Sequence, residues 1–159
     1  MAILTPMTPE QRLSELGLTL PQAPAPVAAY VPAVRSGNLV FISGQVPFVD
    51  GELVARGRVP DVVAVEQASL AARTCALNGL AVLAAQLQNG LSDVLRIVRI
   101  GVFVQCEPGF TGQPIVANGA SELLVEVFGE SGRHARAAVG SIGLPLDATV
   151  EVEMLAEVR

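Results

Sequence analysis

Apolar and polar residues alternate with a period of two near the C-terminus and follow a helical period in the middle of the chain. The alternation of Val150, Val152 and Met154 with glutamates predicts a strand over 149–156 that buries one face. A run rich in β-branched residues predicts a strand over 97–104. Three further strands are predicted over 30–35, 39–45 and 136–142. The pair Asp50-Gly51 is typical of a tight hairpin turn.

Three stretches have the spacing and the end signals of helices. Thr8 followed by Pro9 predicts a short helix through Leu16. Asp61 as N-cap and Asn89-Gly90 as a stop predict a long helix over 61–89 with a face of small apolar residues. A last helix is expected over 114–128. Its inward residues are expected to be Ile115, Asn118, Leu123, Val127 and Phe128.

This order of elements predicts an α+β fold in which one sheet carries two helices on one face. We expect a single domain over residues 1–159, in which residues 1–26 form an N-terminal helix and a proline-rich arm. The other face of the sheet then needs a cover, which sister subunits could supply. The composition agrees, since 51% of residues are apolar and only 16% charged, against roughly 25% charged in an average domain.

Charge and rare residue types exclude several functions. All ten basic residues are arginines, so Schiff-base lysines and phosphate-loop lysines are absent. The net charge of −5 argues against nucleic acid as a partner. His134, Cys75 and Cys106 cannot supply the four ligands of an ordinary zinc site, and the cysteines are expected to be buried in a reducing compartment.

The chain carries no segment that we expect to direct export or span a membrane. Residues 1–7 lack both a basic start and a long apolar run. The uncharged stretch 74–92 contains asparagine, glutamine and glycine, which favours a buried helix over a membrane span. We therefore expect a cytoplasmic protein.

Few residues are candidates for chemistry, and each has a structural alternative. Arg136 lies in an apolar strand, where it needs a carboxylate such as Glu151 or an anionic ligand. Glu151 could orient water or simply be solvated on an outward strand face. Tyr30 could line a site or pack as an ordinary aromatic residue, and Ser43-Gly44 could present backbone amides or mark a bend. His134 remains without a role, because one histidine defines no triad.

Four segments together resemble the RidA family, also called YjgF or endoribonuclease L-PSP. These segments are 29–34, 39–47 (LVFISGQVP), 135–139 (ARAAV) and 144–153 (LPLDATVEVE), and the resemblance extends over about 24–158. It implies a chorismate-mutase-like fold, a homotrimer with ligand clefts between subunits, and hydrolysis of 2-enamine and 2-imine acids to 2-keto acids and ammonia. No cofactor is implied.

The resemblance also assigns roles to individual residues. Arg136 matches the arginine that holds the substrate carboxylate, and Glu151 matches the glutamate that holds water. The other matches are expected to bind substrate: Tyr30, Ser43, Gly44 and Asn118. Ala138 departs from the family, because a cysteine is frequent at this position, and Cys106 does not replace it in sequence.

Two functional alternatives remain open at this stage. The first is a trimer that binds small carboxylates without turnover. The second is an endoribonuclease, which the acidic charge and the lone histidine make the minor alternative.

Overall fold

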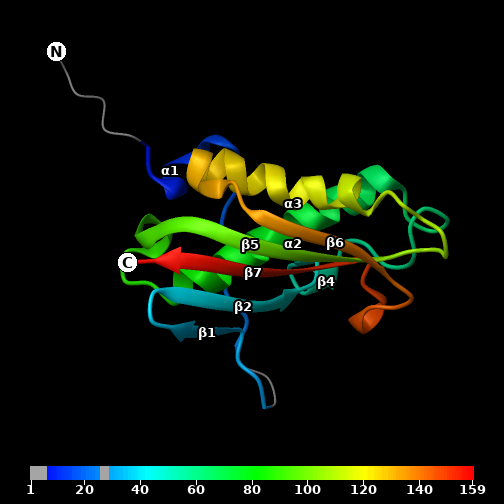
Figure 1. The fold of residues 1–159 in the computed structure, drawn as a ribbon, viewed down its shortest axis with the longest axis horizontal. Coiled ribbons are helices and arrows are strands. Elements are labelled where there is room, and N and C mark those ends of the chain that lie inside the picture. The colour runs from blue at the N-terminus through cyan, green and yellow to red at the C-terminus, as the bar shows by residue number, and fades with distance from the viewer. Residues whose placement is uncertain (1–6, 26–28) are drawn as a thin grey trace.

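Five strands form one sheet, and two long helices cover one of its faces. The computed structural model describes residues 7–25 and 29–159 and gives the strand order β1-β2-β7-β5-β6. The strands are β1 Ala33–Ser36, β2 Leu39–Gln45, β5 Val94–Gln105, β6 Ala135–Ser141 and β7 Val150–Val158. Strands β5 and β6 pair in parallel, and the other neighbours are antiparallel. Figure 1 shows β6 and β1 at opposite edges of this sheet.

The helices divide the covered face between them. The helices are α1 Pro9–Glu15, α2 Val65–Ala85 and α3 Gln113–Phe128. Helix α2 packs on β2 and β7, while α3 packs on β5 and β6 and contacts α2 along its length. The expected α+β arrangement of one sheet with two helices on one face is confirmed, with α1 resting on α3 at the margin.

Small residues let the two long helices approach closely. Ala68, Ala72 and Ala76 of α2 are fully buried. Gly119 of α3 lies so close to the backbone of Ser69 that a Cβ there would come within 1.9 Å of the Ser69 carbonyl oxygen. Helix α2 is long and apolar enough to cross a bilayer, but 61% of its most apolar 18-residue segment is buried inside this fold.

Several boundaries differ from the sequence expectation. The long helix begins at Val65, because Asp61 forms an ion pair with Arg58 at 2.6 Å instead of capping the helix. It ends at Ala85, and Asn89 donates to the carboxylate of Asp93. Ile115 and Asn118 were expected to face inward, but both are exposed, Ile115 at 59%.

The hairpin expected at Asp50-Gly51 is present. It joins β3 Phe48–Val49 to β4 Glu52–Leu53, and both turn residues have positive φ. The short N-terminal helix is also present, and the Thr8 side chain caps it by accepting a hydrogen bond from the Gln11 backbone amide. The expectations for residues 1–6 and for Pro26 lie outside the described residues.

The sheet face away from the helices is open in the single chain. Its exposed apolar side chains come from three strands: Val34 of β1, Phe41 of β2 and Val139 of β6. Each is about half exposed, at 55%, 48% and 47%. Both cysteines are buried, as expected.

Candidate functional site

Arg136 reaches over the sheet edge toward α3. It pairs with Ile100, whose side chain is fully buried under the helices, so Arg136 shares the helix-covered face. Because β6 is an edge strand, the guanidinium still extends into solvent. Its Nη1 donates to Asn118 Oδ1 at 2.9 Å and to Ser121 Oγ at 3.1 Å. Asn118 and Ser121 are three residues apart on α3 and therefore lie on one helix face.

His134 extends this arrangement, which we call the edge cluster: Asn118, Ser121, His134 and Arg136. His134 Nδ1 lies 2.6 Å from the Gly132 carbonyl oxygen, which can only accept a hydrogen bond, so Nδ1 carries the proton. Nε2 of the neutral ring then accepts from the Ser121 hydroxyl at 3.0 Å. Burial, opposed by the hydrogen bond to Gly132 and aided by the charge of Arg136, holds the pKa of His134 below its usual value.

Glu151 lies on the other face of the sheet, against Gly44. We call this pair, together with Ser43, the face cluster. The absence of a side chain at Gly44 leaves room for the carboxylate, since a Cβ there would come within 1.9 Å of Glu151 Oε1. The next outward residue of β7, Glu153, pairs with Arg99 at 3.0 Å. Glu151 has no ion-pair partner among residues 7–25 and 29–159.

Its surroundings make Glu151 a suitable group for proton transfer. Burial, and secondly the charge of Glu153, raise the pKa of Glu151 above the usual glutamate value. A carboxylate with a raised pKa accepts and releases protons closer to neutral pH than an ordinary one. Such shifts are frequent in active sites.

Replacing Glu151 by glutamine is expected to stabilise the fold at neutral pH. Because the pKa of Glu151 is raised, the native state binds this proton more tightly than the unfolded chain does. The free energy of unfolding that this proton contributes is fully present below the ordinary glutamate pKa. It is lost as pH rises from that value through the raised pKa of Glu151 in the native state. Thermal unfolding between pH 4 and pH 8 should show a smaller decline in Tm for Glu151→Gln than for the wild type.

The matched control is Glu52→Gln, which changes an exposed glutamate of the hairpin. Its unfolding profile should follow that of the wild type. If the profile of Glu151→Gln also follows that of the wild type, ionisation of Glu151 does not destabilise the native state and this prediction is wrong.

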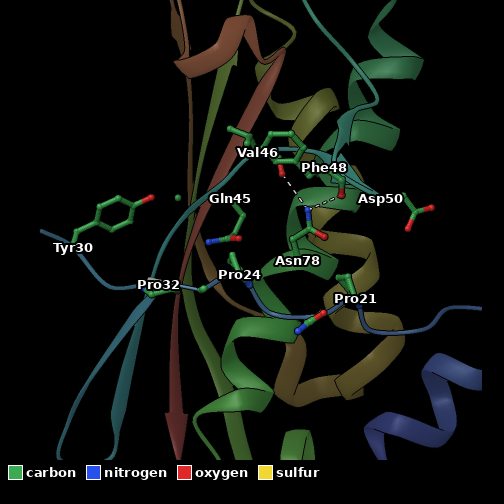
Figure 2. Close-up of a pocket in the computed structure, with 13 residues that line it drawn as sticks. Pro21, Pro24, Tyr30, Pro32, Gln45, Val46, Phe48, Asp50 and Asn78 are labelled. Atoms are coloured by element: carbon green, nitrogen blue, oxygen red, sulfur yellow. Dashed lines mark hydrogen bonds between the residues drawn. The ribbon is translucent and has the colours of Figure 1, made fainter. Parts of the chain in front are cut away.

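Tyr30 lies beside the face cluster, at the mouth of a pocket of about 720 Å³. Ser43 holds this segment, since its hydroxyl donates to the Val31 carbonyl oxygen at 2.9 Å. Figure 2 shows Tyr30 across the pocket from Asn78, whose side-chain amide donates to the carbonyls of Val46 and Phe48. Tyr30 is 61% exposed, so the packed-aromatic alternative is wrong for the single chain.

The edge cluster and the face cluster do not meet within one chain. Strand β5 separates β6 from β7, so Arg136 and Glu151 are not on neighbouring strands. Their partners on β5 are Ile100 and Phe103, which lie an odd number of residues apart and so point to opposite faces. An ion pair between Arg136 and Glu151, the structural alternative from the sequence, is therefore wrong.

Ala138 lies on the same face of β6 as Arg136 and packs against the hydrophobic core. Ala138 lies opposite Val102, and the next residue on that face is Gly140. A Cβ at Gly140 would come within 2.7 Å of the Cys106 sulfur, so this thiol occupies the space beside Gly140. The Cys106 thiol is thus displaced along the strand from the position of Ala138. The described ranges 7–25 and 29–159 contain no cluster of residues suited to a metal ion.

Sequence reasoning did not assign Ser121 or His134. Ser121 lies one helical turn after Asn118, a spacing that would have placed it next to the same partner. His134 precedes Arg136 by two residues, the spacing of side chains on one side of a strand. The sequence contained both signals, but only the contact between α3 and β6 made them meaningful.

Comparisons with known proteins match nearly the whole chain. The family described as "YjgF/chorismate_mutase-like, putative endoribonuclease" matches residues 10–158. Protein TCP17 of Trypanosoma cruzi is 44% identical over 151 residues, which cover 92% of each chain. The crystal structure of Atu1372 from Agrobacterium tumefaciens, a protein with unknown function, has a TM-score of 0.89 and 46% identity, covering 95% of this chain and 92% of that one.

One further solved structure contains a ligand. The E. coli protein TdcF, crystallised with bound serine, has a TM-score of 0.62 and 26% identity. The similarity covers 87% of this chain and 94% of TdcF.

Proposed function

The chain belongs to the YjgF/chorismate-mutase-like family, and on that premise we propose that it hydrolyses 2-enamine and 2-imine acids to 2-keto acids and ammonia. The observation that carries the proposal is how the Arg136 guanidinium is held by its neighbours. Its Nη1 is held by Asn118 and Ser121, whereas its Nε and Nη2 have no hydrogen-bond partner among residues 7–25 and 29–159. A planar guanidinium fixed on one side offers two parallel N–H groups to a carboxylate on the other.

The chemistry of the proposed reaction needs little beyond positioning. A 2-imine acid carries a carboxylate beside its C=N carbon, so binding of the carboxylate by Arg136 fixes the carbon that water attacks. Water adds to this carbon, and the nitrogen then leaves as ammonia. Glu151 is the base that takes a proton from water and passes it to the nitrogen that leaves as ammonia, for which its raised pKa is suited.

In this proposal the complete site needs two copies of the chain. The edge cluster of one copy supplies Arg136, and the face cluster of another supplies Glu151, with Tyr30 beside it. A homotrimer would also cover the open sheet face with its exposed Val34, Phe41 and Val139. The serine bound to TdcF is a small molecule with a carboxylate, which is the ligand class proposed for this site.

Placing a charge on the open face is expected to separate the subunits. Phe41→Asp introduces a carboxylate at a side chain that is 48% exposed in the single chain and covered in the proposed trimer. Sedimentation velocity should give a trimer for the wild type and a monomer for the variant, with loss of deaminase activity. Val62→Asp, a matched change at a 64% exposed residue between β4 and α2, should remain trimeric. A monomeric wild type with full activity would overturn the two-copy site.

The test of the activity couples an amino-acid oxidase to trapping of the released imine by semicarbazide. The wild-type protein should suppress trapping and accelerate ammonia release, and the rank order among amino acids would identify the side chain that the pocket prefers. Glu151→Gln should abolish suppression while still binding 2-keto acids. If neither protein affects trapping, the proposed hydrolysis is wrong.

A second candidate function is carboxylate binding without turnover. It is favoured by the separation of Arg136 from Glu151 within one chain, which keeps the proposed base away from the guanidinium. Binding of 2-oxobutanoate without ammonia release would identify this function. Endoribonuclease activity, which the family description names, remains the minor alternative and predicts RNA cleavage that Arg136→Ala abolishes.

A further inference from the structure

Ser121 and His134 link the Arg136 guanidinium to a group that can change its charge near neutral pH. The Ser121 hydroxyl donates to His134 Nε2 and accepts from Arg136 Nη1, at 3.0 and 3.1 Å. In this state the hydroxyl proton is held by His134 and points away from Arg136. The arrangement fits the free protein, because a neutral imidazole avoids a second positive charge beside Arg136.

Burial, and to a smaller extent the positive charge of Arg136, lower the pKa of His134. Helix α3 contributes the neutral Ser121. Charged residues of both signs lie nearby. Glu130 of the η2 turn (Gly129–Gly132) pairs at 3.0 Å with Arg133, which follows the turn. Arg96 of β5 and Glu157 of β7 line a hollow together with His134. A ligand that neutralises Arg136 therefore removes the charge repulsion that disfavours protonation of His134, while burial of the ring still disfavours it.

Protonation would also reverse one hydrogen bond. A protonated ring donates from Nε2 to Ser121 Oγ, which frees the hydroxyl proton while Ser121 Oγ still accepts from Arg136 Nη1. The proton uptake restores a positive charge beside Arg136 after the bound carboxylate has neutralised the guanidinium. This charge favours the bound anion.

We propose that Ser121 and His134 are positioning residues of the carboxylate site, and that binding of a carboxylate to Arg136 is accompanied by uptake of one proton on His134. The inference rests on the carboxylate-binding role of Arg136 proposed above. Its consequence is a site that binds monocarboxylates together with a proton. Affinity rises as pH falls through the titration of His134.

The measurement uses 2-oxobutanoate as the probe, because a keto acid is the product of the proposed reaction and is not hydrolysed further. Titration calorimetry at pH 8 and pH 5.5 should give binding that is roughly three- to tenfold tighter at the lower pH. Repeating the titration in buffers of different ionisation enthalpy should show proton uptake on binding. His134 is the single histidine of the chain, so its ring NMR signal reports its own titration directly.

His134→Gln is the discriminating variant, since glutamine can still accept from Ser121 but does not titrate. It should bind 2-oxobutanoate with the same affinity at pH 8 and pH 5.5 and take up no proton on binding. Glu52→Gln removes an exposed titratable group of the β3–β4 hairpin and should leave both the pH dependence and the proton uptake unchanged. In Arg136→Gln, the His134 signal should titrate at a higher pH than in the wild type, without any ligand.

Three results would overturn the inference. They are an Arg136→Gln variant with unaltered His134 titration, wild-type binding that is independent of pH, and His134→Gln binding that keeps the pH dependence. If binding of 2-oxobutanoate does not depend on pH but the protein still hydrolyses imine acids, the proposed deaminase activity stands. A wild type that binds no 2-oxobutanoate at either pH would overturn both proposals.

Discussion

Arg136→Ala is expected to lower kcat/KM for imine hydrolysis by roughly 10²- to 10⁴-fold. The substitution removes two charge-assisted hydrogen bonds to the substrate carboxylate, each worth about 1.5–3 kcal/mol. Because the same contact fixes the C=N carbon relative to water, the loss should appear in kcat as well as in KM. Steady-state kinetics from the semicarbazide competition, with the imine generated at several rates, would measure it.

Two control variants separate this effect from unfolding and from a simple loss of charge. Arg133→Ala removes a neighbouring exposed arginine that pairs with Glu130, and it should retain activity within a few-fold. Arg136→Lys keeps the charge but cannot offer two parallel N–H groups, so it should recover only part of the activity. Arg136→Ala with wild-type kinetics would mean that the carboxylate binds elsewhere.

Gly119→Ala is expected to destabilise the fold by about 2–3 kcal/mol, although alanine favours helices by about 1 kcal/mol over glycine. The added Cβ would come within 1.9 Å of the Ser69 carbonyl oxygen, which belongs to the α2 backbone and cannot rotate away. Helices α2 and α3 must therefore separate, which opens space between buried alanines. Urea unfolding followed by circular dichroism would measure the loss.

The same substitution should impair the site, since Gly119 directly follows Asn118 on α3. A shift of α3 moves Asn118 and Ser121 away from Arg136, so carboxylate affinity should fall in the fraction that still folds. Gly143→Ala is the matched control, because a Cβ at Gly143 meets nothing within 4 Å and its φ is not positive. A Gly119→Ala protein as stable as this control would contradict the close helix contact.

The sequence predicted the strands more accurately than the limits of the long helix. Alternation along 149–156 reports burial of one face directly, and β7 covers these residues except the first. Helix ends depend on local competition for hydrogen bonds. Asp61 had the properties of an N-cap, but the ion pair with Arg58 engages its carboxylate four residues before the helix starts.

Arg136 could be selected from the sequence, but its partner could not. A guanidinium in an apolar strand needs an anion or an acceptor, and this requirement follows from the desolvation cost alone. The sequence suggested Glu151, because the two strands follow one another along the chain. The actual partners are on α3, since β6 pairs in parallel with β5 and not with β7.

The sequence by itself determined the α+β fold class, the covered face of β7 and the residue types that exclude lysine and zinc chemistry, because periodicity and composition are local properties of the chain. Only the tertiary structure decided that Arg136 and Glu151 lie on opposite faces and that Asn118, Ser121 and His134 gather around Arg136. The physical reason is that strand order and register set the side of the sheet to which each side chain points, and both depend on contacts between segments far apart in sequence.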